Sequence, residues 1–266
     1  MDTQEAIYHL LNAQPVALAT DFDGTLSAIT PNPQLARIHP GCRDSIAKLR
    51  NDLAWVAVLS GRQVGEVRQL VGLPGVVYLG NHGLERWEKG NRYVEPQALP
   101  YAPVIRSILK RARQELKLPG LLLEDKGITG SIHYRSAQDP PAARKRIASL
   151  LRYLAVEAGL RVVEGRRVVE LRPPLDLNKG TALLDLLRRY AVRGIVYAGD
   201  DETDLDAFRA IHRWGVEEEK RALAVGVISP EMPPGLLTEA DLAVDGVEGV
   251  GDFLAALVKA LSTNHS

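Results

Sequence analysis

Cysteine is nearly absent from this sequence of 266 residues, and long apolar runs are missing altogether. The one thiol, Cys42, has no partner for a disulfide within the chain and cannot build a cysteine-rich zinc site. Since no run of 18 apolar residues occurs, the sequence predicts no membrane-spanning helix. The first residues also lack the basic-then-apolar pattern of a secretory signal. We therefore expect a cytoplasmic protein with no membrane partner.

The chain has no excess of either charge, because 33 basic residues balance 33 acidic ones. A nucleic-acid partner usually requires a basic surface, so this balance argues against one. We expect the local basic runs at 106–113 and 161–167 to be solvated faces or sugar-phosphate contacts. With 45% apolar and 25% charged residues, the composition is typical of a globular protein with one large domain, or a core domain with an insert.

Short apolar runs alternate with amphipathic patterns over most of the chain. The runs have the composition of strands buried on both faces, and they lie at 16–20, 55–59, 76–79, 194–198 and 223–227. The helical patterns lie at 42–52, 63–71, 179–190, 203–211 and 250–261. This alternation predicts an α/β protein with a doubly wound, Rossmann-like parallel sheet.

The pattern changes between about residue 100 and residue 173. Two amphipathic helices, at 104–116 and 141–159, each precede a pair of short strands. That order indicates an α+β unit with antiparallel pairing, closed by Pro173 and Pro174. We therefore predict a Rossmann-like core of residues 1–100 and 174–266, interrupted by an α+β domain at 101–173.

Two carboxylates, Asp21 and Asp23, directly follow the first predicted strand. Because side chains of an extended segment alternate between faces, both point to the same side. Such a pair is tolerated if a cation neutralises it or if one member holds a proton. A turn held by local hydrogen bonds is the alternative explanation.

Three further polar motifs accompany this pair. Ser60-Gly61-Arg62 follows the second strand, where a hydroxyl and free backbone amides form a phosphate cradle, although a simple helix cap explains Ser60 as well. Lys179 opens a helix, where a cation is disfavoured unless an anion lies there too, although a solvated surface lysine is the alternative explanation. The acidic run at 199–204 offers the hard oxygen ligands that suit Mg²⁺, or else complements a helix dipole.

At these motifs the sequence resembles the haloacid-dehalogenase superfamily of phosphatases, and the insert looks like the C2-type cap domain of that superfamily. The resemblance implies that Asp21 is a nucleophile that forms an aspartyl-phosphate, and that Asp23 is the general acid and base. It implies phosphate contacts from Ser60, Gly61, Arg62 and Lys179. It also implies one Mg²⁺ site, made by Asp21, Asp23 (through its carbonyl) and Asp200, with Asp201 and Asp204 in support.

More narrowly, the chain is similar to the trehalose-6-phosphate phosphatase family at residues 80–85, 124–126, 133–135 and 165–173. The resemblance implies hydrolysis of trehalose-6-phosphate to trehalose and phosphate, the last step of trehalose biosynthesis. We expect the protein to be a monomer. It implies sugar contacts from Glu124, Lys126 and Glu170, although a salt-bridged turn also explains the first two. His82 either contacts the substrate or orders its own loop.

Other functions remain open from the sequence. A phosphatase for sucrose phosphate or glucosyl-phosphoglycerate shares the core motifs, so the insert must decide between them. A sugar phosphomutase needs a second phosphate loop, and residues 246–251 lack the spacing of a dinucleotide fingerprint. A catalytically inactive module is disfavoured because Asp21, Asp23 and Lys179 are all present.

Overall fold

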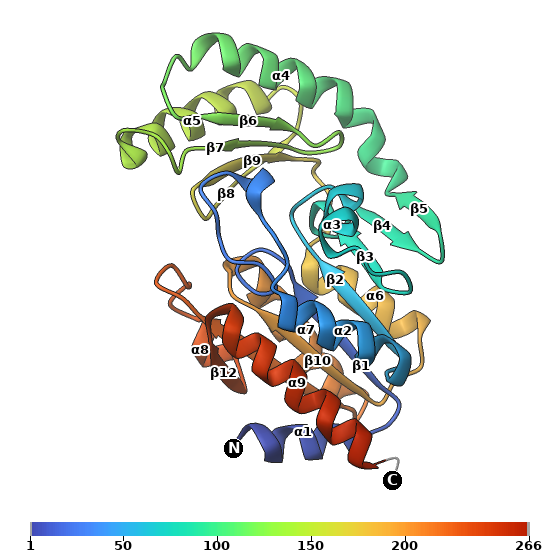
Figure 1. Ribbon diagram of the computed structural model, residues 1–266. Coiled ribbons are helices and arrows are strands. Elements are labelled where there is room, and N and C mark those ends of the chain that lie inside the picture. The colour runs from blue at the N-terminus through green and yellow to red at the C-terminus, as the bar shows by residue number, and fades with distance from the viewer. Residues whose placement is uncertain (1, 265–266) are drawn as a thin grey trace. The chain divides into compact units, whose positions relative to one another are not determined.

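The computed structural model describes residues 2–264 and contains an eight-stranded and a four-stranded sheet (Figure 1). The chain divides into two compact units at Tyr93/Val94 and at Asp176/Leu177. The sequence pattern predicts these divisions near residues 100 and 173. The first division lies earlier because the short helix η3 (Pro96–Tyr101) runs directly into α4 (Ala102–Glu115) and belongs with it. Residues 1, 265 and 266 of the predicted core lie outside the described residues.

The larger sheet has the strand order β12-β11-β10-β1-β2-β3-β4-β5. Its parallel strands are β1 (Val16–Asp21), β2 (Trp55–Leu59), β3 (Val77–Gly80), β10 (Gly194–Gly199), β11 (Arg221–Ile228) and β12 (Leu242–Asp245). One edge departs from the expected parallel pattern, since β4 (Glu85–Glu88) pairs antiparallel with β3 and is followed by β5 (Asn91–Val94). The sequence does not predict β4, β5 and β12, because β4 (ERWE) and β5 (NRYV) carry polar residues instead of an apolar run, and β12 (LAVD) is a four-residue edge strand that is half exposed.

Helices cover both faces of this sheet, which confirms the doubly wound α/β fold. Along β1, Val16 and Leu18 enter one apolar core, whereas Ala17 and Ala19 enter the other. This division explains why the strand reads as an uninterrupted apolar run. The first core is completed by α1 (Thr3–Leu11), α2 (Pro40–Asp52), α3 (Val64–Val71) and α9 (Gly246–Asn264). The second is completed by α6 (Lys179–Arg189), α7 (Glu202–Glu217) and the short α8 (Leu236–Glu239).

The second unit is an antiparallel sheet of order β6-β7-β9-β8 with two helices on one face. Its elements after η3 and α4 are β6 (Leu122–Asp125), β7 (Gly130–His133), α5 (Pro140–Ala155), β8 (Arg161–Gly165) and β9 (Val168–Arg172). Ile132 and Val169 pack beneath the helices, in one core with Ile105 and Ile147. Because strand side chains alternate, the polar residues between these apolar positions lie on the other face of the sheet.

Within residues 2–264, no helix combines the length and the apolar character that crossing a membrane requires.

Candidate active site

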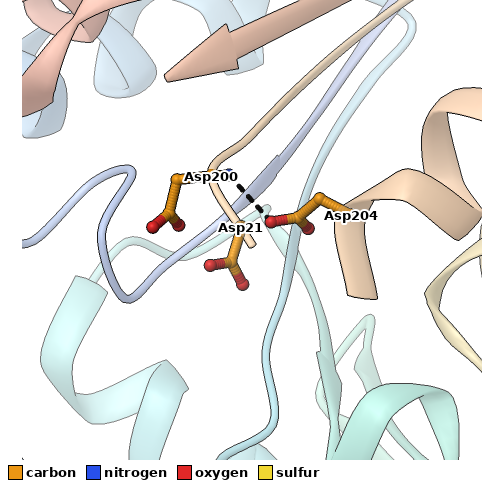
Figure 2. Close-up of side chains that lie close together, drawn as sticks. All are labelled: Asp21, Asp200 and Asp204. Carbon is orange, nitrogen blue, oxygen red and sulfur yellow. Dashed lines mark hydrogen bonds between the residues drawn. The ribbon is translucent and has the colours of Figure 1, made fainter. Parts of the chain in front are cut away.

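Three buried aspartates meet at the carboxyl ends of two neighbouring strands, and we call Asp21, Asp200 and Asp204 the aspartate cluster (Figure 2). Asp21 ends β1, Asp200 directly follows β10, and Asp204 lies in the first turn of α7. Because β1 and β10 pair in parallel, their ends lie at the same edge of the sheet. One carboxylate oxygen of each aspartate lies within 4.8 Å of the others.

The ammonium group of Lys179, at the first residue of α6, lies among these carboxylates. Its Nζ donates to Oδ1 of Asp21 and to Oδ1 of Asp204, each at 2.7 Å, and lies 3.6 Å from Oδ1 of Asp201. Burial disfavours the charged form, but Asp201, Asp204 and Asp21 together raise the pKa of Lys179 well above its ordinary value. The side chain is 1% exposed, so a buried permanent cation faces the cluster.

Asp204 is held by four hydrogen bonds. Its Oδ1 accepts from Lys179 Nζ and from the hydroxyl of Tyr197 at 2.6 Å, while its Oδ2 accepts the backbone N–H groups of Asp200 and Asp201 at 2.9 and 3.0 Å. Burial raises the pKa of Asp204 to about 6, against the effect of Lys179. With both oxygens already occupied by donors, this carboxylate is placed to orient its neighbours more than to bind a ligand.

The negative charge of the cluster exceeds what one lysine neutralises. Burial raises the pKa of Asp21 well above its ordinary value, and the carboxylates of Asp204, Asp201 and Asp200 act in the same direction, whereas Lys179 opposes them. Burial disfavours ionisation of Asp201 too, yet Lys179 and Thr203 lower its pKa below the usual range. Buried, crowded carboxylate oxygens are the donor set that a small divalent cation requires.

Glycine at position 24 allows the chain to pass the cluster. Gly24 has φ +95°, and a Cβ there would lie 2.1 Å from Oδ2 of Asp200. The next residue, Thr25, donates its hydroxyl to Oδ1 of Asp200 at 3.2 Å. The loop after β1 and the loop after β10 therefore fit together only with glycine at this position.

The carboxylate of Asp23 is not free, because both of its oxygens accept hydrogen bonds from Arg62. Nε and Nη2 of Arg62 donate to Oδ2 and Oδ1 of Asp23, each at 2.7 Å. Arg62 also pairs with Glu66 and donates to the carbonyl of Pro33 at 2.9 Å. Although burial opposes it, the hydrogen bonds and charge of Asp23 raise the pKa of Arg62 further. In this arrangement, a phosphate contact from Arg62 requires the pair with Asp23 to open.

The loop of Ser60 and Gly61 is fixed by the segment that follows β3, including the short helix η2 (Asn81–Gly83). The backbone N–H of His82 donates to the carbonyl of Ser60 at 3.0 Å, and that of Asn81 donates to the carbonyl of Arg62 at 2.7 Å. The ring of His82 lies against Gly61, since a Cβ on Gly61 would approach His82 Nε2 to 2.7 Å. Ser60 is 1% exposed, and its Oγ accepts from the backbone N–H of Arg62 at 3.1 Å.

Two side chains that support the site, Tyr197 and Glu85, are not predicted by the sequence. Tyr197 lies in an apolar strand, where its pattern resembles that of any core aromatic residue, and only the fold places its hydroxyl on Asp204. Glu85 is 1% exposed, and its Oε2 accepts from the backbone N–H of Val64 at 2.8 Å and from Nδ2 of Asn81 at 3.1 Å. Its place in the stretch 80–85 was the one available signal.

The predicted sugar residues lie in the second unit, on the sheet face opposite the helices. Glu170, in β9, is paired across the strands with Ser131, whose hydroxyl donates to Oε1 at 2.9 Å. Lys126 Nζ donates to the same oxygen at 3.2 Å, and Arg172 donates to Oε2 through Nε at 2.9 Å. Glu170 is thus 6% exposed and surrounded by donors.

Glu124 forms the other half of this group. Its Oε2 lies 2.7 Å from Nε2 of His133 and 4.0 Å from Nζ of Lys126. The structure therefore brings Glu124, Lys126 and Glu170 together, and it adds three residues that the sequence analysis did not propose for the site. We call the set the second-unit polar cluster: Glu124, Lys126, Ser131, His133, Glu170 and Arg172.

Known proteins resemble this chain in sequence and in structure. The sequence pattern of the family described as trehalose-phosphatase matches residues 19–228. A trehalose-phosphate phosphatase of Mycobacterium bovis is 38% identical over 216 residues, which cover 77% of this chain and 54% of that protein. The chain thus spans about half the length of this relative.

Two solved structures share the fold. The C-terminal domain of C. albicans trehalose-6-phosphate phosphatase superposes with a TM-score of 0.80 at 20% identity, covering 97% of each chain. A haloacid dehalogenase-like hydrolase from Bacteroides thetaiotaomicron gives a TM-score of 0.63 at 16% identity, covering 91% of this chain and 99% of the other. The family match contains the aspartate cluster, Lys179 and the second-unit polar cluster, and it extends over most of the sequence. The chain therefore belongs to the trehalose-phosphatase family and has the haloacid-dehalogenase fold.

Proposed function

We propose that this chain hydrolyses trehalose-6-phosphate to trehalose and inorganic phosphate, through a phosphorylated Asp21 and with Mg²⁺. The observation that carries the proposal is the aspartate cluster, in which buried carboxylates surround one ammonium at the carboxyl edge of a parallel sheet. This edge is where open α/β sheets bind their ligands.

The donor set fits Mg²⁺. The carboxylates of Asp21 and Asp200, with the carbonyl of Asp23, would hold the ion, while Asp204 keeps these groups in place. When bound, Mg²⁺ supplies a Lewis acid that neutralises part of the negative charge of a phosphoryl group. The raised pKa of Asp21 supports this assignment, because it reflects buried negative charge that one lysine does not offset.

The chemistry follows from the side chains at hand. A carboxylate oxygen of Asp21 attacks phosphorus, an O–P bond forms, and the bond from phosphorus to the sugar oxygen breaks. Once its pair with Arg62 opens, Asp23 donates a proton to that leaving oxygen and later removes one from the water that attacks the phosphoryl group. This second attack releases inorganic phosphate and restores Asp21. Lys179, already in contact with Asp21, stabilises the charge on the phosphoryl oxygens throughout.

Sugar recognition is assigned to the second-unit polar cluster. Its carboxylates and cations already neutralise each other, so they offer oriented donors and acceptors to neutral hydroxyl groups. The three residues that we assign to the sugar are Glu124, Lys126 and Glu170.

A substrate panel tests the proposal. Phosphate release is measured for trehalose-6-phosphate, sucrose phosphate, glucosyl-phosphoglycerate and glucose-6-phosphate, with Mg²⁺ and with a chelator. We expect kcat/KM to be highest for trehalose-6-phosphate, by about 100-fold or more. Polar side chains that pair with the hydroxyl groups of one sugar are left unpaired by an analogue, so the analogue is rejected. Chelation should abolish turnover, and added Mg²⁺ should restore it.

The same panel can reject the proposal. A higher kcat/KM for another sugar phosphate would identify that compound as the substrate. Turnover that survives chelation would show that the reaction does not require a metal ion. In ¹⁸O-labelled water, the hydrolase must release phosphate that carries the label, whereas a mutase forms a rearranged sugar phosphate without it.

A further inference from the structure

A cavity of about 620 Å³ opens in the first unit at the amino ends of β2 and β3. The aspartate cluster lies at the opposite, carboxyl edge of the same sheet, since Asp21 is aligned with Leu59 at the end of β2. The five residues of β2 separate the two edges by roughly 13 Å, at about 3.3 Å per residue. We call this cavity the aromatic groove; it is lined by Arg50, Trp55, Arg68, Trp87, Lys89 and Tyr190, among others.

The groove carries an excess of positive charge. No carboxylate within residues 2–264 lies at ion-pair distance from Arg50, Arg68 or Lys89, three cations of its lining. Its one acidic residue is Glu88, which lies 3.2 Å from Nε of Arg86 and accepts the hydroxyl of Tyr190. Positive charges gathered without counter-charges are favourable for an anion.

Two of these cations are held on aromatic rings. The guanidinium of Arg68 lies 4.2 Å from the ring centre of Trp87, and the ammonium of Lys89 lies 5.4 Å from that of Tyr190. A guanidinium stacked on a ring keeps its outer face and its N–H edge available, so it can stack on a planar ligand and bond an anionic oxygen. Both cations therefore need little reordering before they bind.

An unsatisfied donor lies in the same wall. Trp55 is 7% exposed, and its Nε1–H has no hydrogen-bond partner in the part of the chain that is described. A buried donor without a partner costs about 1–3 kcal/mol, so such groups are uncommon in a packed interior. The ring of Trp55 lies 6.5 Å from that of Tyr190, which extends the aromatic wall of the groove.

We propose that the aromatic groove is a second ligand site, which binds a small organic anion with a planar ring. The aromatic side chains of the groove and the stacked guanidinium of Arg68 would pack against the ring of the ligand. Arg50, Arg68 and Lys89 would donate hydrogen bonds to its anionic group. This site is independent of the phosphatase reaction, because none of the residues that line it belongs to the aspartate cluster.

Indole NMR signals of the full chain test the proposal directly. The chain has three tryptophans, of which Trp55 and Trp87 line the groove, whereas Trp214 lies in α7 and does not. The probe is naphthalene-2-sulfonate, an aromatic anion that a phosphatase cannot hydrolyse. We expect saturable shifts of the indole N–H signals of Trp55 and Trp87, with that of Trp214 unchanged.

Matched ligands and variants define the chemistry. Naphthalene-2-sulfonamide removes the charge and methanesulfonate removes the ring, and each should bind at least about tenfold more weakly. Arg68→Ala and Lys89→Ala should each weaken the sulfonate about tenfold, as expected for the loss of a bond to a charged group. Arg213→Ala, which removes an exposed arginine of α7 outside the groove, should leave the affinity unchanged.

Three outcomes would overturn the proposal. The first is the absence of any shift at Trp55 and Trp87 over the titration. The second is equal binding of the sulfonamide and the sulfonate, which would leave an apolar surface without anion preference. The third is unchanged affinity in both cation variants, with their fold verified by circular dichroism.

Discussion

Two polar clusters of this chain are built from similar residues but differ in charge balance. Around Lys179, one ammonium contacts three aspartates, Asp21, Asp201 and Asp204, and the pKa of Asp21 is raised by burial and by its carboxylate neighbours, which include Asp200. In the second-unit polar cluster, Glu124 and Glu170 face two permanent cations and a histidine. The first cluster holds surplus negative charge in a buried place, whereas the second is close to neutral.

This difference in charge supports different roles for the two units, with cation and phosphoryl binding in the first and sugar binding in the second. A site that must bind a divalent cation and a phosphoryl group needs excess carboxylate, because the cation restores neutrality. A site that must bind a neutral sugar needs oriented donors and acceptors whose charges are already compensated. We therefore expect substitutions in the first cluster to affect every substrate, and those in the second to affect the sugar substrate alone.

The largest effect is expected for Asp21→Asn. The amide has nearly the same shape but is neutral, so its remaining oxygen is a poor nucleophile, and kcat should fall by at least about 10³-fold on trehalose-6-phosphate and on an aryl phosphate alike. Steady-state phosphate release measures it. Asp252→Asn, an exposed position in α9, serves as the control with full activity. Appreciable turnover by Asp21→Asn would refute the assignment of the nucleophile.

A more selective loss is expected in the second-unit polar cluster. Glu170→Gln and Lys126→Ala should each lower kcat/KM for trehalose-6-phosphate about 10- to 100-fold, since each removes a charged hydrogen-bonding group from the sugar site. With p-nitrophenyl phosphate the change should stay within about threefold, because that substrate has no sugar. Equal losses on both substrates would break the division between the clusters.

Tyr197→Phe should have a smaller effect on the first cluster. The substitution removes only the hydroxyl that donates to Asp204, so Asp204 and Lys179 gain freedom to move. We expect kcat to fall about tenfold with little change in KM, as for a group that orients the reacting residues. Tyr153→Phe, at a tyrosine that is 70% exposed, is the control. An unchanged kcat would show that Lys179 and the backbone amides suffice to hold Asp204.

The smallest effect concerns an ion pair that belongs to neither cluster, His212 with Asp241. A hydrogen bond to Asp241 raises the pKa of His212 above 6.5, although burial acts in the opposite direction. Burial would raise the pKa of Asp241, but the hydrogen bonds from His212 and from the backbone N–H of Ala224 lower it. The contribution of His212 to the free energy of unfolding is fully present below pH 6.5, and it is lost as the pH rises through the raised pKa of this histidine. The contribution of Asp241 to the free energy of unfolding is present above about pH 3.8, and it is lost as the pH falls through the lowered pKa of this carboxyl.

Urea unfolding of His212→Ala at two pH values measures this pair. After allowance for solvent screening of a half-exposed pair, the loss of unfolding free energy should be about 0.5 kcal/mol near pH 5.5 and smaller at pH 8.5. If the loss were larger at pH 8.5, the protonated form of His212 would not be the stabilising one.

The predictable part of the fold was the part with strong apolar patterning. The five central strands and their helices could be read from runs such as 55–59, because strands buried on both faces must be apolar throughout. The strands β4 and β5 could not be read in this way, since ERWE and NRYV carry no such pattern; β4 is a strand because β3 offers it a pairing edge, and β5 lies next to β4 in the sheet.

For the site, the sequence by itself determined which chemical groups are available. It placed carboxylates directly after two buried strands and a lysine at a helix start, and the parallel pairing of those strands made their approach predictable. Only the tertiary structure decided how each group is used. Asp204 is occupied by four donors, Arg62 holds Asp23, and Tyr197 supports the cluster, because such contacts join residues far apart in the chain or depend on side-chain direction. Local sequence specifies strand ends and charge, but the partner of each buried charge is set by which loops the packed sheet brings together.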